Sequence, residues 1–105
     1  MNGLKKFKGI DDNTGCWLYM IRCGNNALYT GVTVDYNRRW SEHKSGSGAR
    51  YVAAHGFVEP VFLQKFETKG LAMKEENFIK KQDKMYKEEL IKSPLNILTE
   101  EMKKW

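Results

Sequence analysis

The chain has 105 residues, enough for one domain with a packed core and little beyond it. Hydrophobic residues make up 41% of the chain and aromatic residues 12%, which excludes a disordered protein, and the apolar runs are too short for a membrane-spanning helix. Lysine and arginine outnumber aspartate and glutamate by 18 to 13, and the net charge of +5 is compatible with a polyanionic partner such as nucleic acid.

The first fifteen residues differ in composition from the rest of the chain. Segment 1–15 mixes glycine, lysine, aspartate and asparagine without an apolar period, and we expect it to be a flexible basic arm. It has no apolar region typical of a signal peptide. The two cysteines, Cys16 and Cys23, match no C-x-x-C metal or redox spacing. These observations favour a cytoplasmic protein with reduced thiols and no membrane association.

A β-hairpin is the first ordered element that the pattern predicts. Aromatic-rich residues with high strand propensity occupy 17–23, turn residues occupy 24–26, and a second strand pattern covers 27–33. A four-residue loop would place Tyr19 and Tyr29 on opposite faces of the hairpin, whereas a three-residue loop would place them on the same face. The two tyrosines can share a site only in the second register.

The rest of the chain predicts helices and one further strand. In chain order they are a helix over 36–45 capped by Asp35, a helical turn over 49–55, a strand over 61–66 opened by Pro60, a long helix from 68 or 69 to about 82, and a helix over 84–92. The charged tail 98–105 is expected to fray. This β-β-α-(α)-β-α-α order indicates an α/β protein of the α+β type, with a small three-stranded, mainly antiparallel sheet flanked by helices.

Particular polar and aromatic residues recur at informative spacings along these elements. They are Leu18-Tyr19-Met20, Tyr29-Thr30-Gly31, Asp35-x-x-Arg38-Arg39-Trp40-x-x-His43, Glu76 and Asn96. With these residues, segment 16–97 resembles the GIY-YIG nuclease family, and most closely its short bacterial subgroup that consists of the nuclease domain alone. The first motif departs from the family pattern, because Leu18 and Met20 flank the tyrosine and the glycine is missing.

The resemblance implies a metal-dependent DNA endonuclease that acts in DNA repair or recombination and uses one divalent cation, Mg²⁺ or Mn²⁺. Glu76 would hold the cation, Arg39 would bind the scissile phosphate through its planar donors, and Tyr19 would act as the general base or position the attacking water. The other implied site residues would orient groups, relay protons or hold the site together by hydrogen bonds: Tyr29, His43 and Asn96.

The basic residues near these motifs suggest how DNA would be held. Arg38, Lys44 and Arg50 are the expected DNA-binding residues. The chain has no room for the added DNA-binding domains of larger relatives, so we expect weak sequence preference. We expect either a partner protein that supplies targeting or a preference for branched, single-stranded or end-containing DNA.

The choice of acidic residue on the long helix is not settled by periodicity. A helical wheel over Leu71, Ala72, Phe78 and Ile79 places Glu75 near the middle of the apolar stripe and Glu76 on its flank. The family register favours Glu76, with Glu75 as the reserve. The nearby series Lys80, Lys81, Lys84 and Lys87 is typical of a solvated helix face, and a DNA-contacting surface is the alternative.

Plainer structural roles are also open for these residues. Tyr19 and Tyr29 could be cross-strand aromatics, and Arg39 and Glu76 could form an ordinary ion pair. Gly31 lies inside a strand, where a glycine usually allows the close approach of another backbone.

Two other function classes compete with the nuclease hypothesis. A non-catalytic nucleic-acid-binding module with the same fold would bind DNA in a salt-sensitive way that Glu76→Ala leaves unchanged. A protein-interaction domain would instead use an exposed Trp40 or Trp105, and it would show no salt-dependent DNA binding at all.

Overall fold

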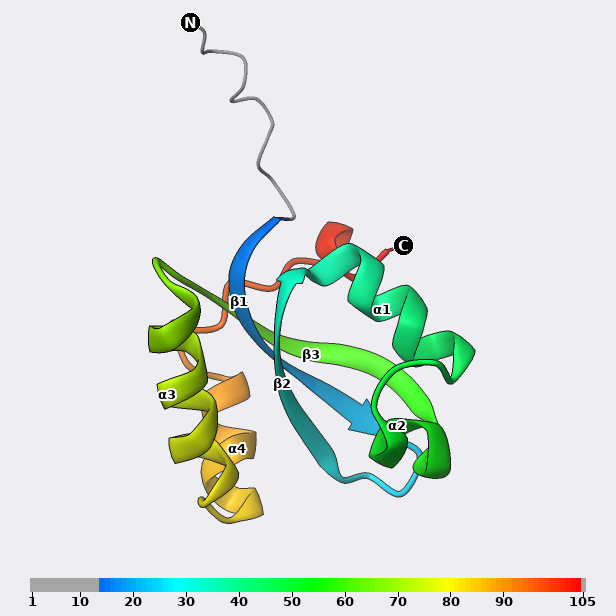
Figure 1. Ribbon diagram of the computed structural model, residues 1–105. Helices are drawn as coiled ribbons and strands as arrows, with labels where there is room; N and C mark the ends of the chain where they lie inside the picture. The colour runs from blue at the N-terminus through cyan, green and yellow to red at the C-terminus, as the bar shows by residue number, and fades with distance from the viewer. Residues whose placement is uncertain (1–13, 105) are drawn as a thin grey trace, which may run out of the picture.

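The computed structural model describes residues 14–104, so the expected arm over 1–15 lies almost wholly outside the described residues, as does Trp105. The elements, shown in Figure 1, are β1 (Thr14–Cys23), β2 (Leu28–Asp35), α1 (Tyr36–Ser45), α2 (Arg50–His55), β3 (Phe57–Phe66), α3 (Lys69–Lys80), α4 (Lys84–Ile91) and the short 3₁₀ helix η3 (Glu101–Lys103). None of these helices is long and apolar enough to cross a lipid bilayer.

The strands form a three-stranded antiparallel sheet in the order β2-β1-β3, with helices packed against it. The predicted α+β fold class is therefore confirmed. β3 begins at Phe57, so Pro60 lies inside the strand and not at its start. The pairing of β1 with β3 shifts register between Met20 and Ile21, opposite this proline. An outer strand with an irregularity accommodates proline, because its missing N–H breaks no regular pairing.

The hairpin adopts the three-residue register. Tyr19 lies opposite Gly31 and Ile21 lies opposite Tyr29. At the turn, the Cys23 N–H donates to the Ala27 carbonyl at 2.9 Å. Since side chains alternate along a strand, Tyr19, Ile21 and Tyr29 share one face of the sheet. The condition for a site shared by the two tyrosines is thus met.

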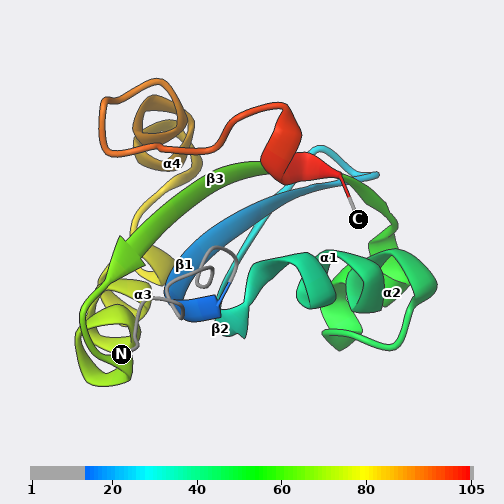
Figure 2. The ribbon, with the colours of Figure 1, turned by 90° about the horizontal axis from the view of Figure 1, so that it is seen from above.

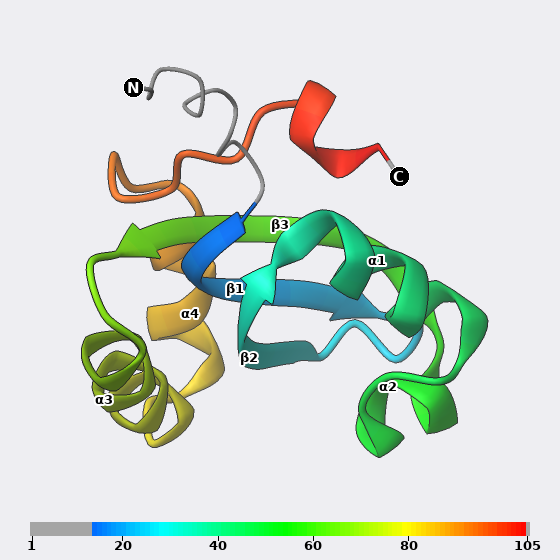
Figure 3. The ribbon, with the colours of Figure 1, turned by 45° about the horizontal axis from the view of Figure 1, so that its top comes forward.

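The central strand β1 divides the hydrophobic core into two clusters. Its odd-numbered residues, including Tyr19, pack against Trp40 of α1 and Val52 of α2. Its even-numbered residues pack against Ile79 of α3 and Leu90 of α4. Figures 2 and 3 show the resulting arrangement, with α1 and α2 at one end of the curved sheet and α3 and α4 at the other.

The helices begin and end close to the predicted positions because their caps are local. Asp35 Oδ1 accepts a hydrogen bond from the Arg38 N–H, and Gly46 ends α1 in the left-handed region at a φ of 88°. Thr68 and Asp83 cap α3 and α4 in the same way as Asp35 caps α1.

The C-terminal segment is docked, contrary to the expectation that it frays. The indole Nε1 of Trp40 donates to the Met102 carbonyl at 2.7 Å, and Asn37 Nδ2 donates to the Lys104 carbonyl at 3.0 Å. Leu98 and Met102 pack against the cluster that contains Trp40. Trp40 is 0% exposed, so it cannot be the exposed docking residue of a protein-interaction domain.

Candidate active site

A hollow of about 210 Å³ lies along the edge strand β2 and is called the site hollow below. Its lining comes from β1, β2, α1 and α3. Four predicted site residues from these elements line it: Tyr19, Tyr29, Arg39 and Glu76. Gly31 and Met73 complete much of the remaining wall. Residues that are distant in the sequence therefore meet around one cavity.

Gly31 makes room for the ring of Tyr19. A Cβ atom on Gly31 would lie 2.5 Å from the Tyr19 hydroxyl oxygen and 2.6 Å from its Cζ. Such distances are well inside van der Waals contact, so only glycine fits here without displacing the ring. The close approach expected at Gly31 exists, but the approaching group is an aromatic side chain and not another backbone.

The phenol of Tyr19 joins His43 and Arg39 in a hydrogen-bonded network. Its hydroxyl oxygen lies 2.7 Å from His43 Nε2, and Arg39 Nε donates to it at 3.3 Å. Because the guanidinium can only donate, the Tyr19 oxygen accepts from Arg39. The Tyr19 hydroxyl donates to His43 Nε2 in the tautomer that carries its proton on Nδ1, an atom that is buried without a hydrogen-bond partner among the described residues.

Burial keeps both members of the Tyr19–His43 pair neutral. Tyr19 is 1% exposed and His43 is 2% exposed. Burial raises the pKa of the Tyr19 phenol above its usual value, and the hydrogen bond from Arg39 opposes this only in part. Burial, together with the positive charge of Arg39, lowers the pKa of His43 to about 4. At neutral pH both side chains are therefore uncharged, and the hydrogen bond between them fixes their orientation.

Arg39 is held by its own helix. Its Nη1 lies 2.7 Å from Glu42 Oε1, while its Nε is used by Tyr19. Among residues 14–104 the structure gives Nη2 no partner, and this group lies on a side chain that lines the site hollow. The guanidinium is therefore positioned with a donor available for an anion.

Glu76 is the acidic residue that α3 brings to the site hollow. Its side chain is 16% exposed, and its Oε2 lies 3.1 Å from Lys80 Nζ. Glu75 does not line the hollow. Lys80 Nζ also lies 5.9 Å from the centroid of the Tyr29 ring. The sequence pattern assigned Lys80 to a solvated face, although its i+4 spacing from Glu76 already allowed this ion pair.

The donor set around the site hollow suits a cation that is shared with substrate. Within the described residues, no group of three or more His, Cys, Asp or Glu side chains could hold a metal ion. Mg²⁺ commonly takes one or two carboxylates together with waters and substrate phosphate oxygens. Glu76, partly buried at the hollow, fits the role of the one protein ligand in such a shell.

Asn96 lies away from the site hollow. Its Oδ1 accepts from the N–H groups of Leu63 and Leu98, both at 3.1 Å. Its Nδ2 donates to the carbonyls of Val61 and Ile91, both at 2.9 Å. The expectation that Asn96 bonds the other site residues is therefore corrected: it bonds the main chain of β3 and of its neighbours instead.

The predicted DNA-binding residues are spread over the surface. Arg38 is on α1, 70% exposed, with its Nε 3.2 Å from Glu42 Oε2. Arg50 is exposed at the start of α2. Lys44 lines a different hollow, between β3 and the C-terminal segment. None of the three lines the site hollow.

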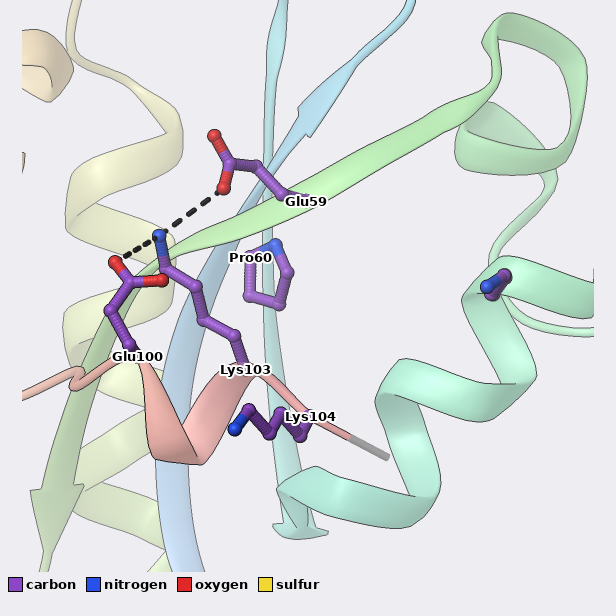
Figure 4. Close-up of a pocket in the computed structure, with 6 residues that line it drawn as sticks. Glu59, Pro60, Glu100, Lys103 and Lys104 are labelled. Carbon is purple, nitrogen blue, oxygen red and sulfur yellow. Dashed lines mark hydrogen bonds and ion pairs between the residues drawn. The ribbon is translucent and has the colours of Figure 1, made fainter.

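That other hollow is larger, about 490 Å³, and contains none of the residues predicted for catalysis. Figure 4 shows Lys103 reaching from η3 toward Glu59 and Glu100. Its Nζ lies 3.2 Å from a carboxylate oxygen of each. With these charges already paired, the site hollow is the better candidate for phosphate chemistry.

Comparison with known proteins finds a family model and relatives that cover most of the chain. The model of the GIY-YIG catalytic domain matches residues 15–89. A UPF0213 protein of Enterobacter sp. (strain 638) is 42% identical over 79 residues, covering 74% of this chain and 78% of the relative. A UPF0213 protein of Fusobacterium nucleatum is 42% identical over 80 residues, with the same coverage of both chains. The solution NMR structure of a UPF0213 protein from Bacillus halodurans has 33% identity and a TM-score of 0.49, covering 76% of this chain and 85% of that one.

Proposed function

The chain belongs to the GIY-YIG family, and on that premise we propose that it is a metal-dependent DNA endonuclease. The family implies a nuclease-type function. The observation that carries the proposal is the site hollow, where Tyr19, Tyr29, Arg39 and Glu76 converge from separate elements. Hydrolysis of a phosphodiester needs groups that bind the phosphate, orient a water and stabilise negative charge. These side chains can supply each of them.

Arg39 would bind the scissile phosphate. Its Nε and Nη1 are already used by Tyr19 and Glu42, so the guanidinium is oriented before substrate arrives. Its Nη2 would donate to a phosphate oxygen and stabilise the charge that develops there. Little reorganisation is needed at the moment of reaction, which is the source of the expected rate gain.

Tyr19 would orient the attacking water. The neutral phenol is fixed by Arg39 and His43, so its oxygen can accept a hydrogen bond from a water in the hollow. Its raised pKa means that it does not act as a ready phenolate at neutral pH. It would accept a proton only when His43 takes the phenolic proton in the same step. Tyr29 would close the hollow beside it.

Glu76 would hold the divalent cation, Mg²⁺ or Mn²⁺. When bound, the cation would supply Lewis-acid stabilisation of the phosphate and of the leaving oxygen. Lys80 pairs with Glu76 at 3.1 Å and balances the carboxylate charge. The single carboxylate is the group on which metal dependence is expected to rest.

The test compares two neighbouring acids on the same helix. Glu76→Gln is expected to lower cleavage of supercoiled plasmid and of branched DNA by at least about 100-fold in Mg²⁺ or Mn²⁺. Glu75→Gln, which removes the same charge outside the site hollow, is expected to stay within about threefold of wild type. Cleavage is measured on gels, and circular dichroism confirms that both variants fold.

Equal cleavage by wild type and Glu76→Gln would remove the catalytic proposal. If no DNA is cut while salt-sensitive DNA binding is retained by Glu76→Gln, the chain is a non-catalytic nucleic-acid-binding module with the same fold. That alternative has one observation in its favour, namely that the site hollow is lined by one carboxylate, and no group of three or more His, Cys, Asp or Glu side chains that could hold a metal ion occurs among residues 14–104.

The DNA contacts, the partner and the cellular role are further parts of the proposal. We propose that Arg38, Lys44 and Arg50 contact DNA outside the site hollow, that a partner protein supplies targeting, and that the enzyme acts in DNA repair or recombination. The net charge of +5 supports DNA binding. A cytoplasmic location is supported by Cys16 and Cys23, which both lie in the described part of the chain and are unpaired thiols there.

A further inference from the structure

A second, smaller hollow adjoins the site hollow. It has a volume of about 160 Å³, and its lining residues are Leu28, Tyr29, Thr30, Tyr51, Lys80 and Lys87. We call it the tyrosine–lysine hollow. Tyr29 lines both hollows. Lys80 also links them, because it lines this one and pairs with Glu76 of the other. A DNA strand that leaves the site hollow past Tyr29 would therefore reach the tyrosine–lysine hollow next.

Two tyrosines form an aromatic wall in this hollow. The rings of Tyr29 and Tyr51 lie within 17° of parallel, with centroids 6.4 Å apart. Tyr51 is 40% exposed, yet it is held in place. Asn25 Nδ2 donates to its hydroxyl at 3.1 Å, and its ring centroid lies 4.4 Å from that of His55. An exposed aromatic ring that is fixed from two sides is suited to stacking with a flat ligand.

Two lysines also line the hollow. Lys80 comes from α3 and Lys87 from α4, so two helices direct ammonium groups to the same hollow. Within residues 14–104 the structure gives Lys87 no ion-pair partner, and Lys80 has only Glu76. Thr30 adds a polar group, since its Oγ1 is buried and has no hydrogen-bond partner among the described residues. Aromatic faces next to two positively charged side chains can bind a base together with its phosphate.

We propose that the tyrosine–lysine hollow binds an unpaired nucleotide of the DNA strand next to the scissile phosphate. The base stacks on Tyr51 and Tyr29, and its phosphate lies between Lys80 and Lys87. The inference rests on the proposed function, and it names the substrate class. A base inside an intact duplex is stacked on both faces and cannot reach Tyr51 without leaving the helix. The preferred substrate is therefore DNA with a single-stranded segment at the cleavage position.

Metal-free binding tests this inference apart from catalysis. Fluorescence anisotropy is measured in EDTA with a labelled 12-nucleotide oligothymidine and with a labelled 12-base-pair duplex. Tyr51→Ala is expected to weaken oligothymidine binding about fivefold or more, the loss typical of one base–aromatic stack, and duplex binding less than twofold. Tyr51→Phe keeps the ring and is expected to bind oligothymidine within twofold of wild type.

The control variants replace residues of the same type that lie outside the hollow. Tyr86 is 38% exposed, which is similar to the exposed fraction of Tyr51, but it lies on α4 and does not line the hollow. Tyr86→Ala is expected to leave oligothymidine binding within twofold of wild type. Lys87→Ala is expected to weaken that binding more than Lys92→Ala, although each removes one positive charge. Thermal unfolding shows whether each variant is folded under the assay conditions.

The outcomes separate the two proposals. If Tyr51→Ala and Tyr86→Ala bind oligothymidine equally well, or if Tyr51→Ala weakens duplex binding as much as single-strand binding, the nucleotide site is wrong even when wild type cleaves DNA. If wild type cleaves nothing in any metal while Tyr51→Ala selectively loses oligothymidine binding, the nucleotide site stands and the endonuclease proposal is wrong.

Discussion

His43 shows how one buried residue sets a pH dependence. Its ring is enclosed by Tyr19 and by Gly48, where an added Cβ would lie 2.6 Å from Nδ1. Burial and the charge of Arg39 lower the pKa of His43 to about 4. The unfolded chain, with a histidine pKa of about 6.5, binds the proton more readily, so this residue's contribution to stability falls as the pH drops from about 6.5 to 4.

We therefore predict that the His43 ring titrates near pH 4 in the folded protein. The measurement is the pH dependence of its imidazole proton and carbon shifts by NMR, with His43→Gln used to assign the resonances. A midpoint near 6.5, the value of an unperturbed histidine, would contradict the buried and neutral imidazole.

Gly31 provides a second prediction for a single residue. Gly31→Ala would place a methyl group 2.5 Å from the Tyr19 hydroxyl, so the ring must move. We expect the free energy of unfolding to fall by about 1–3 kcal/mol, and DNA cleavage to fall with it because Tyr19 is displaced. The readouts are urea unfolding and the plasmid assay.

The matched control is another glycine with open space around it. At Gly70, near the start of α3, the nearest atom to an added Cβ is Thr68 Oγ1 at 3.9 Å. Gly70→Ala is expected to be neutral or to stabilise the protein by up to about 1 kcal/mol, because alanine favours the helix. Equal effects of the two substitutions would show that Gly31 is not a packing requirement.

At the scale of elements, α4 is tied to the sheet by an ion pair. Arg22 of β1 binds Glu88 of α4 through two contacts of 2.5 and 2.9 Å, and both side chains are less than one-third exposed. The hydrogen bonds from Arg22, and then from Lys84, lower the pKa of Glu88 to about 2. The stabilisation is therefore complete above the unfolded pKa of about 4.3 and is lost as the pH falls toward 2.

Glu88→Gln is accordingly predicted to lower the free energy of unfolding by about 1 kcal/mol at pH 7. The difference from wild type should shrink progressively between about pH 5 and pH 2, as followed by urea unfolding across that range. Glu89→Gln is the control on the same helix, because Glu89 is 69% exposed and lies 3.8 Å from Lys92. A constant difference at all pH values would exclude an electrostatic origin.

The elements also show what the sequence could predict. The sequence predicts the hairpin and the helix ends, because turns and caps depend on neighbouring residues. It leaves two hairpin registers open, and only one of them places both tyrosines on the same face. The apolar periodicity of α3 places Glu75 near the middle of its stripe only if Leu71 and Phe78 both belong to the core. Both are 49% exposed, while Ala72 and Ile79 are fully buried, and this moves Glu76 toward the sheet. Periodicity cannot tell which apolar residues a tertiary contact will cover.

At the scale of the whole molecule, the site depends on assembly across the sheet. Arg39 and His43 come from the helix on one face, and Glu76 comes from α3, which packs on the other. Arg39 and Glu76 both line the cavity because it lies at the edge strand β2, and His43 contacts it through Tyr19. The sequence therefore predicted the residues through the family resemblance, whereas the docked C-terminal segment, the position of Asn96 and the tyrosine–lysine hollow depend on contacts distant in the chain.

The hydrogen bonds of Asn96 have a consequence for the opposite border of the sheet. β3 is an outer strand, and such strands present main-chain groups that can template the addition of a foreign strand. Here Leu63 is satisfied at both its N–H, by Asn96, and its carbonyl, by the Ile97 N–H at 2.9 Å. Val61 likewise gives its carbonyl to Asn96. Asn96 and the Ile97 N–H therefore occupy main-chain groups of Val61 and Leu63 to which an added strand would otherwise bind.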